Sequence, residues 1–186
     1  MRVLFIFGTR PEAIKLAPVI HEMRRDDFFE VKVCVTAQHR QMLDQVLGLF
    51  SISPDIDLDI MRPNQSLADL TASVVKKIDE VLLQEKPDMV IIQGDTTTVM
   101  AAGLSAFYQR IPVSHVEAGL RSHNIYSPFP EELNRRVVSL FAKYHFAPTE
   151  NAKRMLISEG ISEDCVFVVG NTVIDALFYV LKTEEP

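Results

Sequence analysis

Charged side chains gather at the points of the chain where a short apolar run has just ended. Six of them stand in the loops after such runs or in the first two turns of the next helix: Arg10, Lys15, Asp95, Glu117, Glu131 and Arg135. Carboxylates with tuned pKa values can move protons to and from a substrate. Cations beside helix N-termini can hold a phosphorylated ligand. The combination predicts acid/base chemistry on a phosphorylated metabolite.

Each of these residues also has an ordinary structural explanation. Asp95 with its following threonines is typical of a helix N-cap, and for an isolated aspartate we weight capping over catalysis by about two to one. Glu131 can complement a helix macrodipole, and Arg135 can belong to a solvated helix face. The segment after Phe7 is neither a GxGxxG fingerprint nor a Walker motif, which weakens dinucleotide and NTPase readings.

The elements that must position these residues follow a regular rhythm. Strands are predicted at 3–7, 31–35, 57–61, 89–92, 113–116, 144–146 and 166–169. Helical spacing predicts helices at 11–23, 42–50, 66–86, 131–141, 151–158 and 173–182. A further helix is predicted after residue 98 and ends at 109. Strands that are apolar on both faces and alternate with helices indicate a parallel sheet covered on both sides. We therefore predict an α/β fold, a doubly wound, Rossmann-like parallel sheet of about seven strands.

In open α/β sheets, ligands bind outside the carboxyl ends of the strands. Most polar clusters of this chain follow a predicted strand, so the fold would bring them to one edge. His39 and His123 fall on this edge without metal-ligand spacing, whereas His115 stands inside an apolar strand and is predicted to be a core residue. The joint pattern favours a functional site at this edge.

Five segments, in this order and spacing, resemble the non-hydrolysing UDP-N-acetylglucosamine 2-epimerases. They are Gly8–Lys15 (GTRPEAIK), Thr36–Arg40 (TAQHR), Gln93–Thr97 (QGDTT), His115–Arg121 (HVEAGLR) and Pro130–Arg136 (PEELNRR). The resemblance runs from Met1 to about Lys182. It implies the N-terminal half of a two-domain architecture similar to glycosyltransferase type B, with the substrate between the domains. We expect an N-terminal Rossmann-like domain at 1–182, the start of an interdomain linker at 183–186, and a C-terminal domain absent from this chain.

The resemblance implies a reaction as well. The family interconverts UDP-GlcNAc and UDP-ManNAc by eliminating UDP to give 2-acetamidoglucal and then adding UDP back. Asp95, Glu117 and Glu131 resemble its catalytic carboxylates, and the sequence does not decide which of them removes the C2 proton. The residues that would bind substrate are Arg10, Lys15, Asp95, Glu117 and Arg135.

A second binding strip is implied for bacterial members, where UDP-GlcNAc also acts as an allosteric activator. Gln38, His39 and Gln41 resemble that strip. The chain has Asn64 directly before Gln65, where the family pattern leads us to expect a basic residue. The family uses neither a metal nor another cofactor, feeds bacterial polysaccharide synthesis, and commonly forms homodimers. We expect the isolated half to have little or no activity.

Other classes of enzyme and a non-enzyme remain as alternatives. A hydrolysing epimerase and a glycosyltransferase half share the architecture and differ in their products, a free sugar or a glycosylated acceptor. A non-catalytic module that binds a nucleotide-sugar is the third alternative. The intact first-strand and HVEAGLR segments favour the non-hydrolysing epimerase.

Composition excludes several further classes. The 186 residues include 19 Lys and Arg against 25 Asp and Glu, a net charge of −6. Proteins that grip nucleic acid usually have a basic surplus, so we expect no nucleic-acid partner. Cys34 and Cys165 lie in apolar runs, which predicts two buried thiols in a reducing compartment. No apolar stretch approaches the ~18 residues of a membrane span, so we expect a soluble cytoplasmic protein without a membrane partner.

Overall fold

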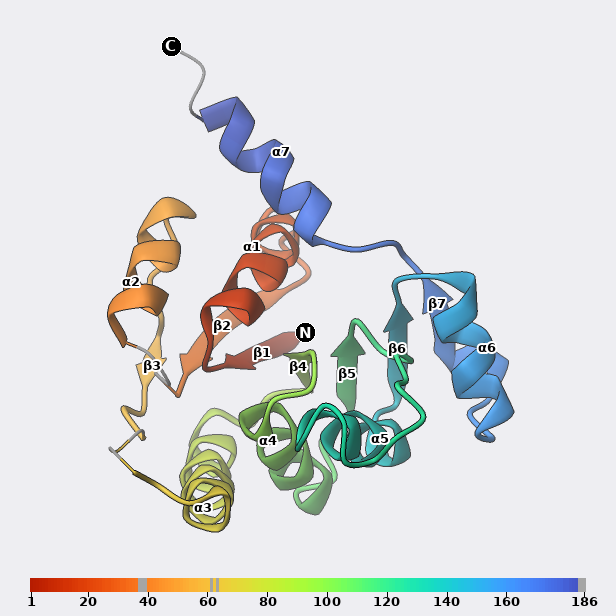
Figure 1. The fold of residues 1–186 in the computed structure, drawn as a ribbon. Helices are drawn as coiled ribbons and strands as arrows, with labels where there is room; N and C mark the ends of the chain where they lie inside the picture. Colours follow the sequence, from red (N-terminus) through yellow and green to blue (C-terminus); the bar gives the residue numbers. More distant parts are fainter. Residues whose placement is uncertain (37–39, 61, 63, 184–186) are drawn as a thin grey trace.

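The computed structural model describes residues 1–36, 40–60, 62 and 64–183, and within them the chain forms one parallel sheet with helices on both faces (Figure 1). Its strands are β1 (Arg2–Phe7), β2 (Glu30–Val35), β3 (Ile56–Asp57), β4 (Met89–Gln93), β5 (Val113–Val116), β6 (Tyr144–Ala147) and β7 (Val166–Val168). The α-helices are α1 (Arg10–Arg24), α2 (Arg40–Leu49), α3 (Leu67–Glu85), α4 (Thr97–Tyr108), α5 (Glu131–Phe141), α6 (Glu150–Ser158) and α7 (Val173–Thr183). The strand order β3-β2-β1-β4-β5-β6-β7 confirms the predicted doubly wound fold.

Strand β1 shows why the sheet is covered on both faces. Val3, Phe5 and Phe7 enter the core between the sheet and helices α1 and α2. Leu4 and Ile6, which alternate with them, enter the opposite core beneath α3, α4 and α5. Successive side chains of a strand point to opposite faces, so a continuous apolar run is what a central strand of this sheet requires.

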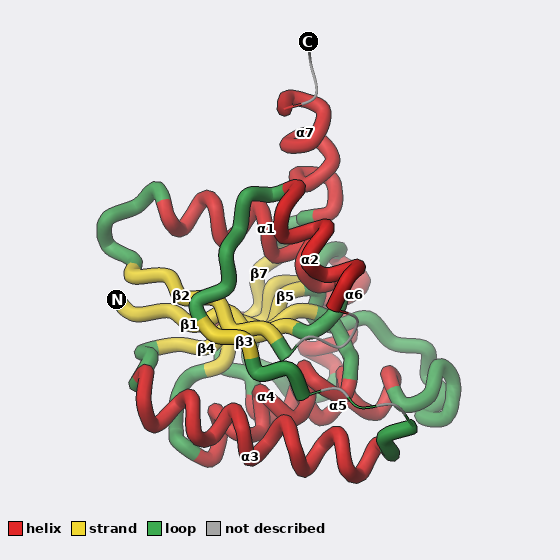
Figure 2. The backbone as a smooth tube through the Cα atoms, turned by 90° about the vertical axis from the view of Figure 1, so that its left-hand side faces the viewer, coloured by secondary structure: helices red, strands yellow, loops and turns green. Residues whose placement is uncertain are grey.

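The helices divide between the two faces in the way that these cores require. Figure 2 shows the sheet as a middle layer, with α3, α4 and α5 on one side and α1 and α2 on the other. Helix α7 packs against α1 and extends away from the body of the domain (Figure 1). The ring of Tyr179 on α7 stacks on His21 of α1 with 5.0 Å between centroids.

The strand order places a topological switch point between β1 and β4. From β1 the chain proceeds to β2 and β3 on one side, and from β4 to β5, β6 and β7 on the other. The loops that leave β1 and β4 therefore diverge at the carboxyl edge, where open α/β sheets bind ligands. These are the loops that contain Gly8 to Arg10 and Gly94 to Thr96.

Several local predictions are confirmed and others are wrong. Ser66 caps α3 by accepting the Asp69 N–H, and the helix stops at Lys86, which is left-handed (φ 47°) before Pro87. The predicted strand 57–61 is only the two-residue β3, within the described residues. Cys34 is buried as predicted, whereas Cys165 is only partly buried and lies in a 3₁₀ turn before β7.

No helix among the described residues is long and apolar enough to cross a membrane.

Candidate active site

Glu117 is the centre of the polar cluster at the carboxyl edge. It directly follows β5 and has left-handed backbone (φ 66°), a conformation that non-glycine residues seldom adopt and that concentrates at functional sites. Its Oε2 atom accepts a bond from Lys15 Nζ at 2.5 Å and another from Gln93 Nε2. Its Oε1 atom faces Asn171 Nδ2 at 3.5 Å. Four elements far apart in sequence thus meet at one carboxylate.

Asp95 forms the second part of the cluster. Its carboxylate pairs with Arg135 of α5, and its backbone carbonyl accepts a bond from Asn134 Nδ2 at 2.9 Å. Burial raises the pKa of Asp95 above its ordinary value, Arg135 opposes that rise, and the charges of Glu131 and Glu117 add to it. The charge of Asp95 therefore interacts with the charges of both other predicted carboxylates, Glu117 and Glu131.

The capping explanation for Asp95 is wrong. Helix α4 is capped by the next residue, Thr96, whose hydroxyl accepts the Val99 N–H at 3.3 Å. The Asp95 carboxylate is therefore directed to Arg135 rather than to the helix end. Glu131 begins α5, is half-buried, and has no side-chain hydrogen bond or ion pair within the described part of the chain.

Glu12 is a site residue to which the sequence analysis gave no role. It is buried and joins the loops on both sides of the switch point. One oxygen accepts the backbone N–H groups of Gly8 and Thr9 at 2.7 and 2.9 Å. The other accepts the hydroxyl of Thr96 at 2.7 Å. Burial raises the pKa of Glu12, with the bonds from Gly8, Thr96 and Thr9 acting in the opposite direction.

The Glu12 bonds limit how the first loop can hold an anion. Two backbone N–H groups that a phosphate would otherwise use are already committed to this carboxylate. Arg10, the first residue of α1, is exposed, and its side chain has no bond to another residue of the described chain. Of the predicted binding residues, Arg10 is therefore the cation that stands open to solvent at this loop.

Part of the predicted edge serves structure instead. Arg121 ends the HVEAGLR segment that follows β5, but its side chain is 1% exposed and binds Glu159 at 2.6 and 2.9 Å. Glu132 is fully buried and accepts bonds from Ser122 N–H and Arg136. Although burial alone would raise the pKa of Glu132, these bonds hold it below its ordinary value.

His115 is buried in β5, as predicted, and supports the loop that contains Asp95. Its Nε2 atom lies 2.7 Å from the Gly94 carbonyl oxygen, so Nε2 carries the proton and donates it. Burial lowers the pKa of His115 to about 4. A neutral imidazole therefore fixes Gly94, whose φ is 82°, next to Asp95.

The predicted activator strip is not tested by the structure. Gln38 and His39 lie outside the described residues, and the side chain of Gln41 does too. His123, also predicted at the edge, is exposed with φ 63°. Among the described residues, no group of three or more His, Cys, Asp or Glu side chains is arranged to hold a metal ion.

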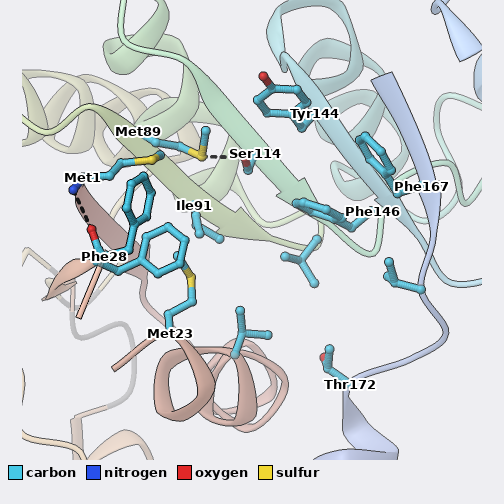
Figure 3. A pocket seen from close by; sticks show the side chains of 14 residues that line it. Met1, Met23, Phe28, Met89, Ile91, Ser114, Tyr144, Phe146, Phe167 and Thr172 are labelled. Carbon is cyan, nitrogen blue, oxygen red and sulfur yellow. Dashed lines mark hydrogen bonds between the residues drawn. The ribbon is translucent and has the colours of Figure 1, made fainter. Parts of the chain in front are cut away.

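A separate apolar hollow of about 550 Å³ opens between α1 and the face of strands β4 to β7 (Figure 3). Met23, Phe28 and Phe146 are among its lining residues. One of its polar groups, the Ser114 hydroxyl, donates to the Met89 sulfur at 3.0 Å. Among the described residues, no charged side chain lines the hollow, so it suits an apolar surface rather than a sugar diphosphate.

The fold is similar to one half of structures of the glycosyltransferase B kind. In fold alone, the chain is similar to a lipopolysaccharide outer core galactosyltransferase (TM-score 0.67, 16% identity, 92% of this chain and 46% of that one). A family model described as UDP-N-acetylglucosamine 2-epimerase matches residues 21–186. The chain belongs to this family.

Individual relatives agree with the family assignment. A UDP-N-acetylglucosamine 2-epimerase of Yersinia pestis is 58% identical over 180 residues, which are 97% of this chain and 48% of the relative. The crystal structure of the Neisseria meningitidis UDP-GlcNAc 2-epimerase bound to UDP-GlcNAc has a TM-score of 0.96 and 58% identity, over 98% of this chain and 49% of that one. The chain spans about half the length of the curated relatives it matches.

Proposed function

We propose that this chain is the half of a UDP-GlcNAc 2-epimerase that supplies the acid/base carboxylates and part of the diphosphate clamp. The observation that carries the proposal is the Glu117 cluster. One carboxylate receives Lys15 and Gln93, and it lies close enough to Asp95 for their charges to interact. Membership of the family, and the UDP-GlcNAc bound in a relative of the same fold, favour a nucleotide-sugar as the ligand.

The proposed reaction explains why both signs of charge are needed. A carboxylate takes the proton from C2 of the sugar, the C1–O bond breaks, and its electron pair leaves on the UDP oxygen. The neutral product is 2-acetamidoglucal. Addition of UDP back to C1, with a proton delivered to the opposite face of C2, gives UDP-ManNAc. At least one acid/base group on each face of the sugar ring is required, together with cations that retain the departing UDP.

The described residues can be given these roles. Glu117, Asp95 and Glu131 are the proposed proton-transfer groups, and the burial that raises the pKa of Asp95 suits it to hold or release a proton. Arg10, Lys15 and Arg135 are the proposed cations for the diphosphate. Arg135 would then exchange part of its bond to Asp95 for the ligand, which links binding to the protonation of that carboxylate.

We further propose that turnover needs the second half that the relatives contain. The polar cluster lies at an open edge, and exclusion of water and fixed geometry are what a closed cleft adds. The outer side of α7 also leaves apolar side chains uncovered, with Ile174, Leu177 and Phe178 each more than half exposed. A covering half of the protein would bury such a surface together with the apolar hollow.

A binding titration tests the ligand assignment on the chain itself. We expect saturable but weak binding of UDP-GlcNAc, with amide shifts at the loops after β1 and β4 in NMR spectra. Arg135→Met should abolish these shifts. Arg25→Met should preserve them, because Arg25 is an exposed arginine at the far end of α1, paired with Glu22. Absence of binding by the wild-type chain at millimolar UDP-GlcNAc, or equal loss in both variants, would contradict the proposal.

The family resemblance also leads us to propose a homodimer. Helices α3, α4 and α5 pack side by side and expose Leu83, Phe107, Tyr108 and Leu140 at 54–83% of their surface. Exposed apolar clusters of this kind mark protein interfaces. Sedimentation should show a dimer that Leu140→Glu dissociates and that Leu177→Glu on α7 leaves intact, whereas a monomeric wild-type chain would refute this part of the proposal.

A further inference from the structure

Asn171 lies between β7 and α7, and its side-chain amide has a fixed orientation. The Oδ1 atom accepts the Val173 N–H at 3.1 Å at the start of α7. A backbone N–H can only donate, so the oxygen must face Val173. The Nδ2 group is then the end that faces Glu117, 54 residues earlier in the chain. The start of α7 therefore directs a hydrogen-bond donor at the centre of the candidate site.

The two oxygens of Glu117 differ in their surroundings. Oε2 is occupied by two donors, Lys15 and Gln93. Among the described residues, Oε1 has the Asn171 amide alone, at 3.5 Å, which is the longest of the three contacts. An oxygen that must accept or deliver a proton needs a free lone pair. Oε1 is the oxygen with a free lone pair, and the hydrogen bond from Asn171 orients it.

The helices behind these contacts form one packed unit. Lys15 is on α1, and Asn171 lies two residues before the start of α7. The two helices are in contact, and the ring of Tyr179 on α7 lies 5.0 Å from that of His21 on α1 and 5.3 Å from that of Phe50. One donor to each oxygen of Glu117 is therefore tied to this pair of helices, Lys15 to Oε2 and Asn171 to Oε1, and a shift of α7 would move Asn171 relative to the carboxylate.

We propose that Asn171 is a positioning residue that presents Glu117 Oε1 as the proton-transferring oxygen. This inference rests on the proposed function of Glu117. Asn171 itself transfers no proton, because a neutral amide remains a donor throughout. Its contribution is to orient the carboxylate with a hydrogen bond.

The variant Asn171→Asp tests the role with little change of shape. Aspartate keeps the oxygen that accepts the Val173 N–H, so α7 keeps its start. The second oxygen places a like charge beside Oε1 where a donor stood. Asn124→Asp is the matched control, because Asn124 also accepts the N–H two residues ahead, from Tyr126 at 3.0 Å, but in an exposed loop.

The first measurement is an NMR titration of the Glu117 side-chain carboxyl carbon in this 186-residue chain. The charged groups that face this carboxylate are Lys15 from α1 and Asp95 from the loop after β4. We expect Asn171→Asp to move the Glu117 titration upward by about one pH unit, the size of effect that a unit charge about 4 Å away exerts. Asn124→Asp should leave it in place. Equal titrations in wild type and Asn171→Asp would overturn the proposal.

The second measurement uses the chain joined to the carboxyl-terminal half of the Yersinia pestis relative. Asn171→Asp should lower kcat more at pH 5 than at pH 8, by up to about tenfold, because a one-unit upward shift reduces the deprotonated fraction of the base by at most tenfold and leaves it unchanged well above the pKa. KM should stay within about twofold. A purely structural effect would lower kcat equally at both pH values and would overturn the proposal. If wild-type joined protein is inactive, the proposed function fails, and the titration still decides whether Asn171 controls Glu117.

Discussion

Replacement of Glu12 by alanine should destabilise this domain more than any change at the exposed carboxyl edge. The carboxylate is 2% exposed and accepts the Gly8 and Thr9 N–H groups and the Thr96 hydroxyl. Each buried donor left without an acceptor costs about 1–3 kcal/mol. The hydroxyl can rotate to another acceptor, and loss of the buried charge returns part of the cost. We therefore expect a loss of about 3 kcal/mol in the free energy of unfolding.

Chemical unfolding followed by circular dichroism measures this loss directly. For a domain of this size, 3 kcal/mol corresponds to a fall in Tm of about 6–12 °C. Glu12→Gln is the matched variant, because its carbonyl can still accept the Gly8 and Thr9 N–H groups and its amide can donate to Thr96. It should lose about 1 kcal/mol. An alanine variant within 1 kcal/mol of wild type would refute the role that we assign to Glu12.

The pH dependence of the same pair tests the electrostatic part of the reasoning. Burial raises the pKa of Glu12 in the folded protein, so the folded state binds this proton more tightly than the unfolded state does. The stabilisation that the Glu12 proton gives to wild type is fully present below pH 4.5, the ordinary pKa of a glutamate. It is lost as the pH rises through the higher pKa of the folded state. Glu12→Gln lacks this loss, so its stability relative to wild type should improve with rising pH. A constant difference would contradict the raised pKa.

Three further outcomes follow from the structure. In the protein joined to its second half, Glu117→Gln should abolish turnover while UDP-GlcNAc binding is retained, and unchanged turnover would remove Glu117 from the mechanism. Wild type should lose stability as the pH falls from 6.5 towards 4, because the buried His115 has a pKa of about 4 in the folded state and gains its proton only on unfolding. The variant His115→Gln keeps a donor for Gly94 and should flatten that part of the stability profile. Burial raises the pKa of the Cys34 thiol to about 12. A thiol reagent should therefore modify Cys165 in the native chain and reach Cys34 only after unfolding. Rapid modification of both thiols in the native chain would contradict the burial of Cys34.

The sequence predicted the fold well because the signals were local. The predicted strand 113–116 and helix 131–141 agree with the structure at both ends. A buried strand is a short apolar run with turn residues beside it, and a helix has a 3.6-residue period. The edge strand β3 was overestimated because its alternation continues beyond the two residues that find a partner in β2.

The site was only partly predictable because its contacts are not local. The edge position of Glu117 follows from its place after a strand, but the three donors around it come from Lys15, Gln93 and Asn171, up to 102 residues away. No spacing rule in the sequence reports such pairings. Arg121 shows the same limit, since this cation of the loop after β5 is paired with a distant carboxylate, that of Glu159.

A search of the sequence for capping boxes would have identified Glu12. It follows Thr9 by three residues at the start of a helix, which is the spacing of a capping box. The Thr9 N–H bond to Glu12 is part of that arrangement. The second bond, to Thr96 across the switch point, needed the three-dimensional structure.

The central claim is that the carboxylate cluster moves the C2 proton of UDP-GlcNAc once a second half completes the cleft. Proton NMR of UDP-GlcNAc in D2O tests it most directly, first with this chain alone and then with the chain joined to the second half of a relative. We predict no exchange with the chain alone. With the joined protein we predict deuterium at C2 and the appearance of UDP-ManNAc. A joined protein that folds and binds UDP-GlcNAc but leaves the C2 proton in place would contradict the account.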